Sequence, residues 1–146
     1  MSKQMSPRPT AAFVGASWLA LIVGMTTYLL GVWNAPDMLL NERGYYFTLL
    51  MYGLFSAVSL QKSVRDRLEG VKVTGIYFGL CWFSLLLSIL LLSIGLFNAT
   101  LTPSEKGFYA MAFLLSLFAA VAVQKNVRDI ALADDDARSS PTFVKD

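Results

Sequence analysis

The chain has 146 residues, of which 55% are hydrophobic and 15% are charged, and its formal net charge is +2. Together with a mean hydropathy of +0.55, this composition lies outside the range of ordinary soluble domains and inside that of membrane proteins. Histidine is absent and Cys81 is the single cysteine, so the commonest general base and metal ligand is missing and an intramolecular disulfide is excluded.

Charged residues are absent from four long stretches, at 9–36, 44–61, 73–104 and 107–124. Because about 20 residues of helix cross a hydrocarbon layer of about 30 Å, each stretch predicts one membrane-spanning helix. The second and fourth stretches are only just long enough, so we expect their flanking basic side chains to reach into the interfaces. The alternative, a soluble helical domain, needs amphipathic helices to cover its buried ones, and the sequence offers none.

The chain repeats itself. Between 42–66 and 105–129, 12 of 25 positions are identical, which predicts a tandem duplication. Further agreement lies upstream, where Gly-Val-Trp-Asn-Ala at 31–35 returns as Gly-Leu-Phe-Asn-Ala at 95–99. We therefore expect an all-α membrane protein in which four transmembrane helices form two tandem helical hairpins. The expected parts are a cytoplasmic N-terminal segment (1–10), a first two-helix repeat (11–66), a cytoplasmic linker (67–74), a second two-helix repeat (75–129) and a disordered cytoplasmic tail (130–146).

Basic residues are distributed unequally between the predicted connections. Ten of the twelve Lys and Arg residues lie before the first span, between the second and third, or after the fourth. Only Arg43 and Lys106 lie in the other two connections. This bias predicts that both termini and the middle linker face the cytoplasm. Because each repeat holds an even number of spans, both copies insert with the same orientation, and we expect a pseudo-twofold axis along the membrane normal.

The two external turns carry recognisable helix-end residues. Asn34 and Asn98 follow the last apolar residues of their helices, where Asn is able to adopt the left-handed conformation that ends a helix. Asn41 and Ser104 each precede a glutamate. This order predicts an N-cap followed by an acid in the first turn, which suits the positive end of the helix dipole.

Small residues recur at helical spacing within the spans. Intervals of three, four and seven residues place them along one stripe of each helix, where they allow backbones to approach closely. We interpret the stripe as a helix-packing surface; the alternative is a narrow pore lined by small side chains. A further GxxxG at 75–79 suggests contacts between protomers. The predicted packing residues are Ala20, Gly24, Gly31, Gly53, Ala57, Ser84, Ser88, Gly95, Ser116 and Ala120.

A polar motif, Gln-Lys-x-Val-Arg-Asp, closes both repeats. Its basic groups suit lipid headgroups at a cytoplasmic helix end. An anchor needs only basic residues, however, whereas here the acid, the amide and the valine recur as well. We therefore predict that Arg65 pairs with Asp129, and Arg128 with Asp66, across the pseudo-twofold. The candidate residues for contacts between repeats or with headgroups are Gln61, Lys62, Arg65, Asp66, Gln124, Lys125, Arg128 and Asp129.

The residues offer little chemistry beyond packing. No Asp, Glu, Lys or Arg lies inside a predicted span, which argues against a proton-coupled transporter. The acids Asp37, Glu42 and Glu105 would bind a cation weakly at most, and acids at helix starts are usually caps. We find no catalytic constellation and no phosphate-binding loop, and thus expect no enzyme, no catalytic residues, no cofactor, no metal and no nucleic-acid partner.

With these motifs in view, the chain resembles the YiaA/YiaB family of bacterial inner-membrane proteins. The resemblance covers roughly residues 11–129, and it includes polar motifs at defined spacing as well as apolar runs. It implies a multi-pass protein of the bacterial inner membrane with a cytoplasmic C-terminus, and it supplies no established activity.

We expect a structural or partner-binding component whose partners are membrane lipid and either further copies of the chain or other membrane proteins. The alternative is a passive channel or small-solute facilitator with a pore lined by small residues. A continuous polar or small-residue lumen would favour the channel, whereas a dry packed interior would favour the structural role.

Overall fold

Four long helices make up the fold. The computed structural model describes residues 6–140, and within them the helices are α1 (Ala11–Asn34), α2 (Leu40–Leu68), α3 (Gly75–Asn98) and α4 (Pro103–Ser139). Parts of the expected N-terminal segment and tail, residues 1–5 and 141–146, lie outside the described residues. Helices α1, α3 and α4 are each long and apolar enough to cross a membrane, whereas α2 falls short of this apolarity in the part of the chain described.

The caps of α2 and α4 differ from the expected ones. Asn41 and Ser104 lie inside the first turn, so the prediction that they are N-caps is wrong. The cap residues are Leu39 and Thr102, two positions earlier, and each donates its backbone N–H to the glutamate of the first turn. The acid therefore acts as a capping-box residue at N3, which satisfies an amide that the helix leaves unpaired.

The ends of α1 and α3 also differ from expectation. In the described residues only Gly70 has a positive φ, of 78°, so the prediction that Asn34 and Asn98 are left-handed is wrong. Both are the last residues of their helices, and their side-chain amides donate to the carbonyl oxygens of Leu30 and Ile94. The amide side chain thus bonds back to its own helix.

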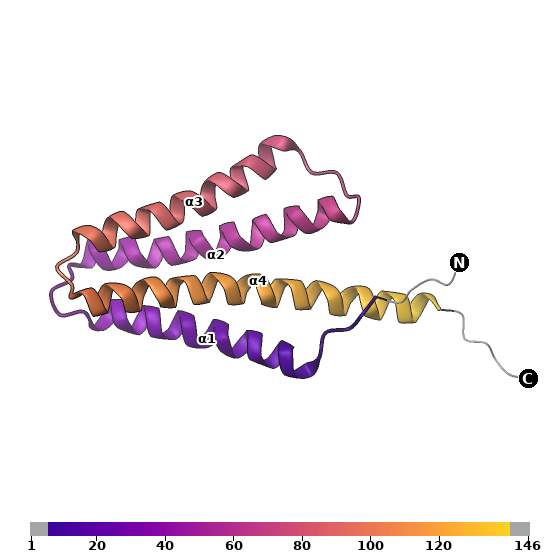
Figure 1. The fold of residues 1–146 in the computed structure, drawn as a ribbon, viewed down its shortest axis with the longest axis horizontal. Coiled ribbons are helices and arrows are strands. Elements are labelled where there is room, and N and C mark those ends of the chain that lie inside the picture. Colours follow the sequence, from indigo (N-terminus) through magenta and orange to yellow (C-terminus); the bar gives the residue numbers. More distant parts are fainter. Residues whose placement is uncertain (1–5, 141–146) are drawn as a thin grey trace, which may run out of the picture.

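The helices lie in a single row in the order α3, α2, α4, α1 (Figure 1). The connections 35–39 and 99–102 lie at one end of this row, which we call the turn end. The connection 69–74 lies at the opposite end, which we call the linker end. Helix α4 continues beyond the other helices at the linker end.

Most of the packing joins one repeat to the other. The largest interfaces are those of α1 with α4 and of α2 with α3, and α2 also packs on α4 in the middle of the row. The contact between α1 and α2 within the first repeat is small, as is that between α3 and α4 within the second. The chain therefore follows the predicted hairpin path, but the two helices of one hairpin are not each other's main packing partners.

The core lies between the two central helices and the turn-end halves of α1 and α3. Leu50 of α2, Phe113 of α4 and Tyr28 of α1 are fully buried. The Tyr28 hydroxyl donates to the carbonyl oxygen of Tyr46 at 2.9 Å, and its ring meets that of Tyr109 edge to face, with centroids 6.0 Å apart. A buried phenol needs such a partner, so this tyrosine ties α1 to both central helices.

The tail prediction is wrong for the residues that the structure describes. Helix α4 runs on from residue 130 to Ser139, where we expected disorder from the lack of apolar periodicity. Two aspartates of this extension bind the segment before α1: Asp136 accepts from the backbone N–H and hydroxyl of Ser6, and Asp134 pairs with Arg8 at 2.8 Å. Polar contacts with residues distant in sequence thus support a segment without an apolar face.

Candidate functional site

The two Gln-Lys-x-Val-Arg-Asp motifs meet at the linker end. The first lies near the end of α2 and the second on α4, and these two helices are neighbours in the row. Within each motif the lysine pairs with the aspartate four residues on, at 2.7 Å for Lys62–Asp66 and 2.8 Å for Lys125–Asp129. These are ordinary neighbours on one helix face, so they alone do not join the repeats.

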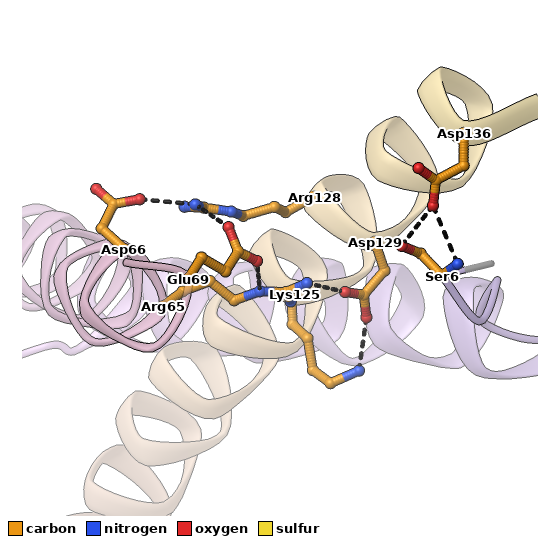
Figure 2. Close-up of polar contacts among 8 residues, drawn as sticks. All are labelled: Ser6, Arg65, Asp66, Glu69, Lys125, Arg128, Asp129 and Asp136. Atoms are coloured by element: carbon orange, nitrogen blue, oxygen red, sulfur yellow. Dashed lines mark hydrogen bonds and ion pairs between the residues drawn. The ribbon is translucent and has the colours of Figure 1, made fainter. Parts of the chain in front are cut away.

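The arginines make the contacts between the motifs. Arg65 of α2 binds Asp129 of α4, and Arg128 of α4 binds Asp66 of α2 at 2.7 Å (Figure 2). Both pairings that we expected from the repeated motif are thus present in the structure. The arginine side chains are 20% exposed, and Asp66 and Asp129 are 10% and 14% exposed. Both bridges are therefore more shielded from solvent than fully exposed pairs, which contribute little.

Glu69 is a member of this cluster that sequence reasoning missed. Its carboxylate accepts from Arg65 at 2.8 Å and from Arg128 at 2.6 Å, so it bridges the two arginines (Figure 2). The available signal was its position four residues after Arg65 on a helix that continues to Leu68, whereas we expected the repeat to end at Asp66. We call these seven residues the ionic cluster: Lys62, Arg65, Asp66, Glu69, Lys125, Arg128 and Asp129.

The cluster lowers the pKa of all three of its acids. Hydrogen bonds from Lys62 and then Arg128 lower the pKa of Asp66. Hydrogen bonds from Arg65 and then Arg128 lower the pKa of Glu69. For Asp129, burial raises the pKa, but the hydrogen bonds from Lys125 and Arg65 together outweigh it and the net shift is downward. The acids are therefore held as carboxylates at neutral pH.

The third position of the motif, which differs between the two copies, makes a buried polar contact in each repeat. Ser63 of α2 lies 3.6 Å from the Cys81 sulfur of α3. At the matching position of α4, Asn126 donates its side-chain amide to the Ser17 hydroxyl of α1 at 3.2 Å. A shift of 64 residues relates Ser17 to Cys81 and a shift of 63 relates Ser63 to Asn126, so the two contacts occupy equivalent places in the two repeats.

The remaining motif residues play a smaller part in the cluster. Gln61 and Gln124 are half-buried, and their side chains make no hydrogen bond within the described part of the chain. The Oε1 atom of Gln61 is buried without a hydrogen-bond partner there. The amides therefore recur in sequence without a shared contact in the structure.

The predicted packing residues lie at interfaces. None of them is exposed, and the glycines among them admit no side chain. A Cβ on Gly24 would lie 2.7 Å from the Ser116 hydroxyl, and one on Gly53 would lie 2.7 Å from the Phe113 ring. By contrast, a Cβ on Gly75 or Gly79 would meet nothing within 4 Å. The stripe packs helices inside the chain, whereas the GxxxG at 75–79 makes no such contact.

A pocket of about 430 Å³ lies at the turn end and is lined by residues of both turns. Its acids are Asp37, Glu42 and Glu105, the three that we considered as weak cation ligands. Two of them already accept backbone hydrogen bonds as capping residues. Among the described residues no group of three or more acids or cysteines is arranged to hold a metal ion.

Comparison with known proteins finds two copies of one domain. The family described as "yiaA/B two helix domain" matches residues 13–66 and 77–129. The chain is 59% identical over 121 residues to Inner membrane protein YiaA of Escherichia coli, covering 83% of each protein. It is 31% identical over 100 residues to Inner membrane protein YiaB of the same organism, covering 68% of this chain and 84% of that one.

A third relative comes from a different bacterium. The chain is 32% identical over 66 residues to Uncharacterized membrane protein YubF of Bacillus subtilis, covering 45% of this chain and 76% of that protein. No solved structure matches the chain. The inner-membrane relatives and the apolar helices together support a multi-pass protein of the bacterial inner membrane.

Proposed function

Because the chain belongs to the yiaA/B two helix domain family, we propose that it is a non-enzymatic structural or partner-binding component of the bacterial inner membrane that assembles into oligomers. In this proposal all four helices cross the membrane, the linker end and both termini face the cytoplasm, and a pseudo-twofold along the membrane normal relates the repeats.

The place of α2 in the row supports a fourth span. Helix α2 packs between α3 and α4, both of which are apolar and long enough to cross a membrane. It has 29 residues, and its charged residues lie in its first turns and after residue 61. A helix held between two spans has to occupy the same depth as they do. The excess of basic residues toward the linker end supports the cytoplasmic orientation of that end.

Equivalent contacts support the pseudo-twofold. A Cβ on Gly31 of α1 would lie 2.8 Å from the ring of Tyr109 on α4. The matching glycine of α3, Gly95, faces Tyr45 and Tyr46 of α2, and a Cβ there would lie 2.7 Å from the Tyr45 ring. The reciprocal arginine–aspartate pairs of the ionic cluster follow the same relation.

The proposed assembly role rests mainly on apolar side chains that are exposed on the two central helices. Phe55 of α2 is 72% exposed and Phe118 of α4, at the matching position, is 73% exposed. In a row of helices even the central members keep such outward faces. They must meet lipid or other proteins, because nothing else in the described chain covers them.

The interior between the central helices supports a structural role over a channel within one protomer. Gly53 of α2 lies against the ring of Phe113, so closely that an added Cβ would be 2.7 Å away. Leu50 and Phe113 are fully buried at this interface. Such a filled seam leaves no room for a solute, and a channel would therefore need a pore at an axis between protomers.

Cysteine cross-linking in membranes tests the proposed assembly. In a Cys81→Ala background, Phe55→Cys and Phe118→Cys place single thiols on the outward faces, and Ala57→Cys, whose side chain is 4% exposed, is the buried control. We expect disulfide-linked dimers from at least one outward position and none from Ala57→Cys. A protein that stays monomeric at both outward positions, and that has monomer mass in lipid nanodiscs, would contradict the proposal.

The proposed orientation has its own test. Lys72 in the linker and Thr100 in a turn are exposed, so Lys72→Cys and Thr100→Cys in the same background are open to a membrane-impermeant maleimide. We expect only Thr100→Cys to react in intact spheroplasts and both to react after lysis. Reaction of both variants in intact spheroplasts would contradict the four-span topology. Reaction of Lys72→Cys alone would show that the linker end faces the periplasm, which is the opposite of the proposed orientation.

A further inference from the structure

An apolar groove of about 560 Å³ lies beside the ionic cluster. Its walls come from three helices: Leu60 and Val64 of α2, Trp82 and Leu85 of α3, and Val121 of α4. The volume falls in the range of about 300–1,000 Å³ that is typical of ligand sites. Because the groove opens on the side of the helix row, its mouth faces the hydrocarbon of the proposed membrane.

One end of this groove is basic. Arg65 and Lys125 line it, and both belong to the ionic cluster, in which four basic residues face three acidic ones. Asp129 accepts hydrogen bonds from both of the lining cations. Its negative charge disfavours the binding of an anion nearby. Lys125 nevertheless keeps free donors, because its side chain is 53% exposed and its ammonium carries three N–H groups. Among the described residues it makes one bond, to Asp129.

An unpartnered amide lies at the same place. Gln61 lines the groove, and its Oε1 atom is buried without a hydrogen-bond partner among the described residues. The oxygen and nitrogen of an amide exchange places on a half-turn of the side chain. The amide is therefore able to donate to an anionic oxygen or to accept from a hydroxyl, and either bond would relieve the cost of a buried orphan group.

We propose that this groove binds one phospholipid with an anionic headgroup. An acyl chain lies between α2, α3 and α4 against Trp82, and the headgroup phosphate accepts from Lys125 and the Gln61 amide at the cytoplasmic interface. The charge pattern selects this occupant: apolar walls of membrane depth end at basic and amide donors, which complement the tail and phosphate of a lipid. The inference rests on membrane insertion, and it is independent of the proposed oligomers.

The duplication supplies a matched control for Lys125. Lys62 occupies the same position in the first motif, makes the same bond to an aspartate four residues on, and is 57% exposed. It does not line the groove. Lys62→Gln and Lys125→Gln therefore remove the same charge and the same kind of ion pair from the protein, but only the second removes a group from the groove.

Quenching of Trp82 fluorescence by brominated lipid tests the proposal. Trp18→Phe and Trp33→Phe leave Trp82 as the single tryptophan, and the full chain is reconstituted into phosphatidylcholine vesicles. Brominated phosphatidylglycerol is then compared with brominated phosphatidylcholine. Since a basic residue near an anionic surface contributes about 1 kcal/mol, we expect about fivefold stronger apparent binding of the anionic lipid at Trp82. Lys125→Gln abolishes most of this preference, and Lys62→Gln preserves it.

A second variant tests the groove by volume. Val121→Phe narrows the groove and lowers the quenching of Trp82 by brominated phosphatidylglycerol, whereas Val58→Phe at the matching position of α2 leaves this quenching unchanged. Equal quenching by the two lipids in the parent protein, or an equal loss from Lys62→Gln and Lys125→Gln, would overturn the proposal. Protection of Trp82 from both lipids would also overturn it and would indicate a second copy in the groove. The first two results would leave the outcome of the cross-linking experiment, and with it the proposed oligomers, unaffected.

Discussion

At the scale of single residues, glycine has two different environments in these helices. A Cβ on Gly24 would lie 2.7 Å from the Ser116 hydroxyl and 3.1 Å from its backbone nitrogen. On the same helix, a Cβ on Gly15 would meet nothing within 4 Å. The first glycine permits α1 to approach α4, and the second only carries the entropic cost of glycine in a helix. The structure thus distinguishes glycines that are needed for helix packing from glycines that make no contact with another helix.

This difference predicts opposite effects of the same substitution. Gly24→Ala gains about 1 kcal/mol of helix propensity but forces apart a contact that includes backbone, which costs about 1–3 kcal/mol. We expect a net loss of about 1 kcal/mol, whereas Gly15→Ala gains about 0.5–1 kcal/mol. The measurement is thermal unfolding in detergent, monitored through the reaction of the Cys81 thiol with a thiol reagent. This thiol is buried in the folded chain. Equal effects of the two variants would contradict the close approach.

At the scale of elements, the ionic cluster joins the end of α2 to the middle of α4. Arg65 and Asp129 come from different repeats, and both side chains are largely shielded. Glu69 adds a second acceptor between the two arginines. The cluster is therefore a network, in which removal of one member changes the partners of several others.

A double-mutant cycle measures the bond between the repeats. We expect Arg65→Ala and Asp129→Ala to be coupled by about 1 kcal/mol in the free energy of unfolding. The pair Arg8 and Asp134 is a control, because its side chains are 61% and 48% exposed and such pairs contribute about 0–1 kcal/mol. Purely additive effects of the Arg65 and Asp129 substitutions would show that the bridge does not hold the repeats in register.

The cluster also predicts a stability that falls in acid. The pKa values of Asp66, Glu69 and Asp129 are lowered in the folded chain. Their contribution is therefore complete above the unfolded pKa values, which lie near 4, and is lost as the pH falls through the lower folded values. We expect a constant melting temperature from about pH 7 to pH 5 and a decline below about pH 4.

Two variants attribute this decline to the cluster. Glu69→Gln removes one of the titrating acids from the bridge and makes the decline smaller. Asp37→Asn changes an acid in the distant turn between α1 and α2 and leaves the decline as it is in the parent. A decline that Glu69→Gln does not reduce would locate the acid sensitivity elsewhere in the chain.

At the scale of the whole molecule, the row of helices makes each repeat depend on the other. Helix α1 packs mainly on α4, and α3 mainly on α2. The residues that fit these surfaces together, such as Gly31 against Tyr109, come from different repeats. A single repeat would therefore leave its packing faces without their partner, which a second copy or the second repeat has to supply.

Splitting the chain between Gly70 and Val71 tests this dependence. The two halves, co-expressed with Cys81→Ala, carry Ser17→Cys and Asn126→Cys at positions whose side chains are 3.2 Å apart. We expect a disulfide-linked heterodimer of halves on a non-reducing gel after mild oxidation. Leu19→Cys in place of Ser17→Cys is the control, because Leu19 is 63% exposed. Linkage at Leu19 alone would contradict the packing of α1 on α4.

Contacts between repeated motifs were predictable from the sequence, whereas contacts made by residues without a counterpart in the other repeat were not. The repeated motif predicted the pairs Arg65–Asp129 and Arg128–Asp66, which lie together in the structure, because identical polar motifs in two copies indicate a shared polar interface. Glu69 was missed, since it lies in the linker and has no counterpart in the second copy. The helical tail was also missed, because Asp134 and Asp136 are supported by residues more than 100 positions away.

By itself the sequence determined four helices, their approximate limits and the duplication, because charge-free length, periodicity and motif identity are properties of neighbouring residues. Only the tertiary structure decided that α1 pairs with α4 rather than α2, and that the groove beside Trp82 ends at Lys125 but not at Lys62. The physical reason is that helices in an apolar solvent associate through close fit and polar bonds. Which small residue fits which ring is fixed by three-dimensional shape, and a linear pattern does not contain it.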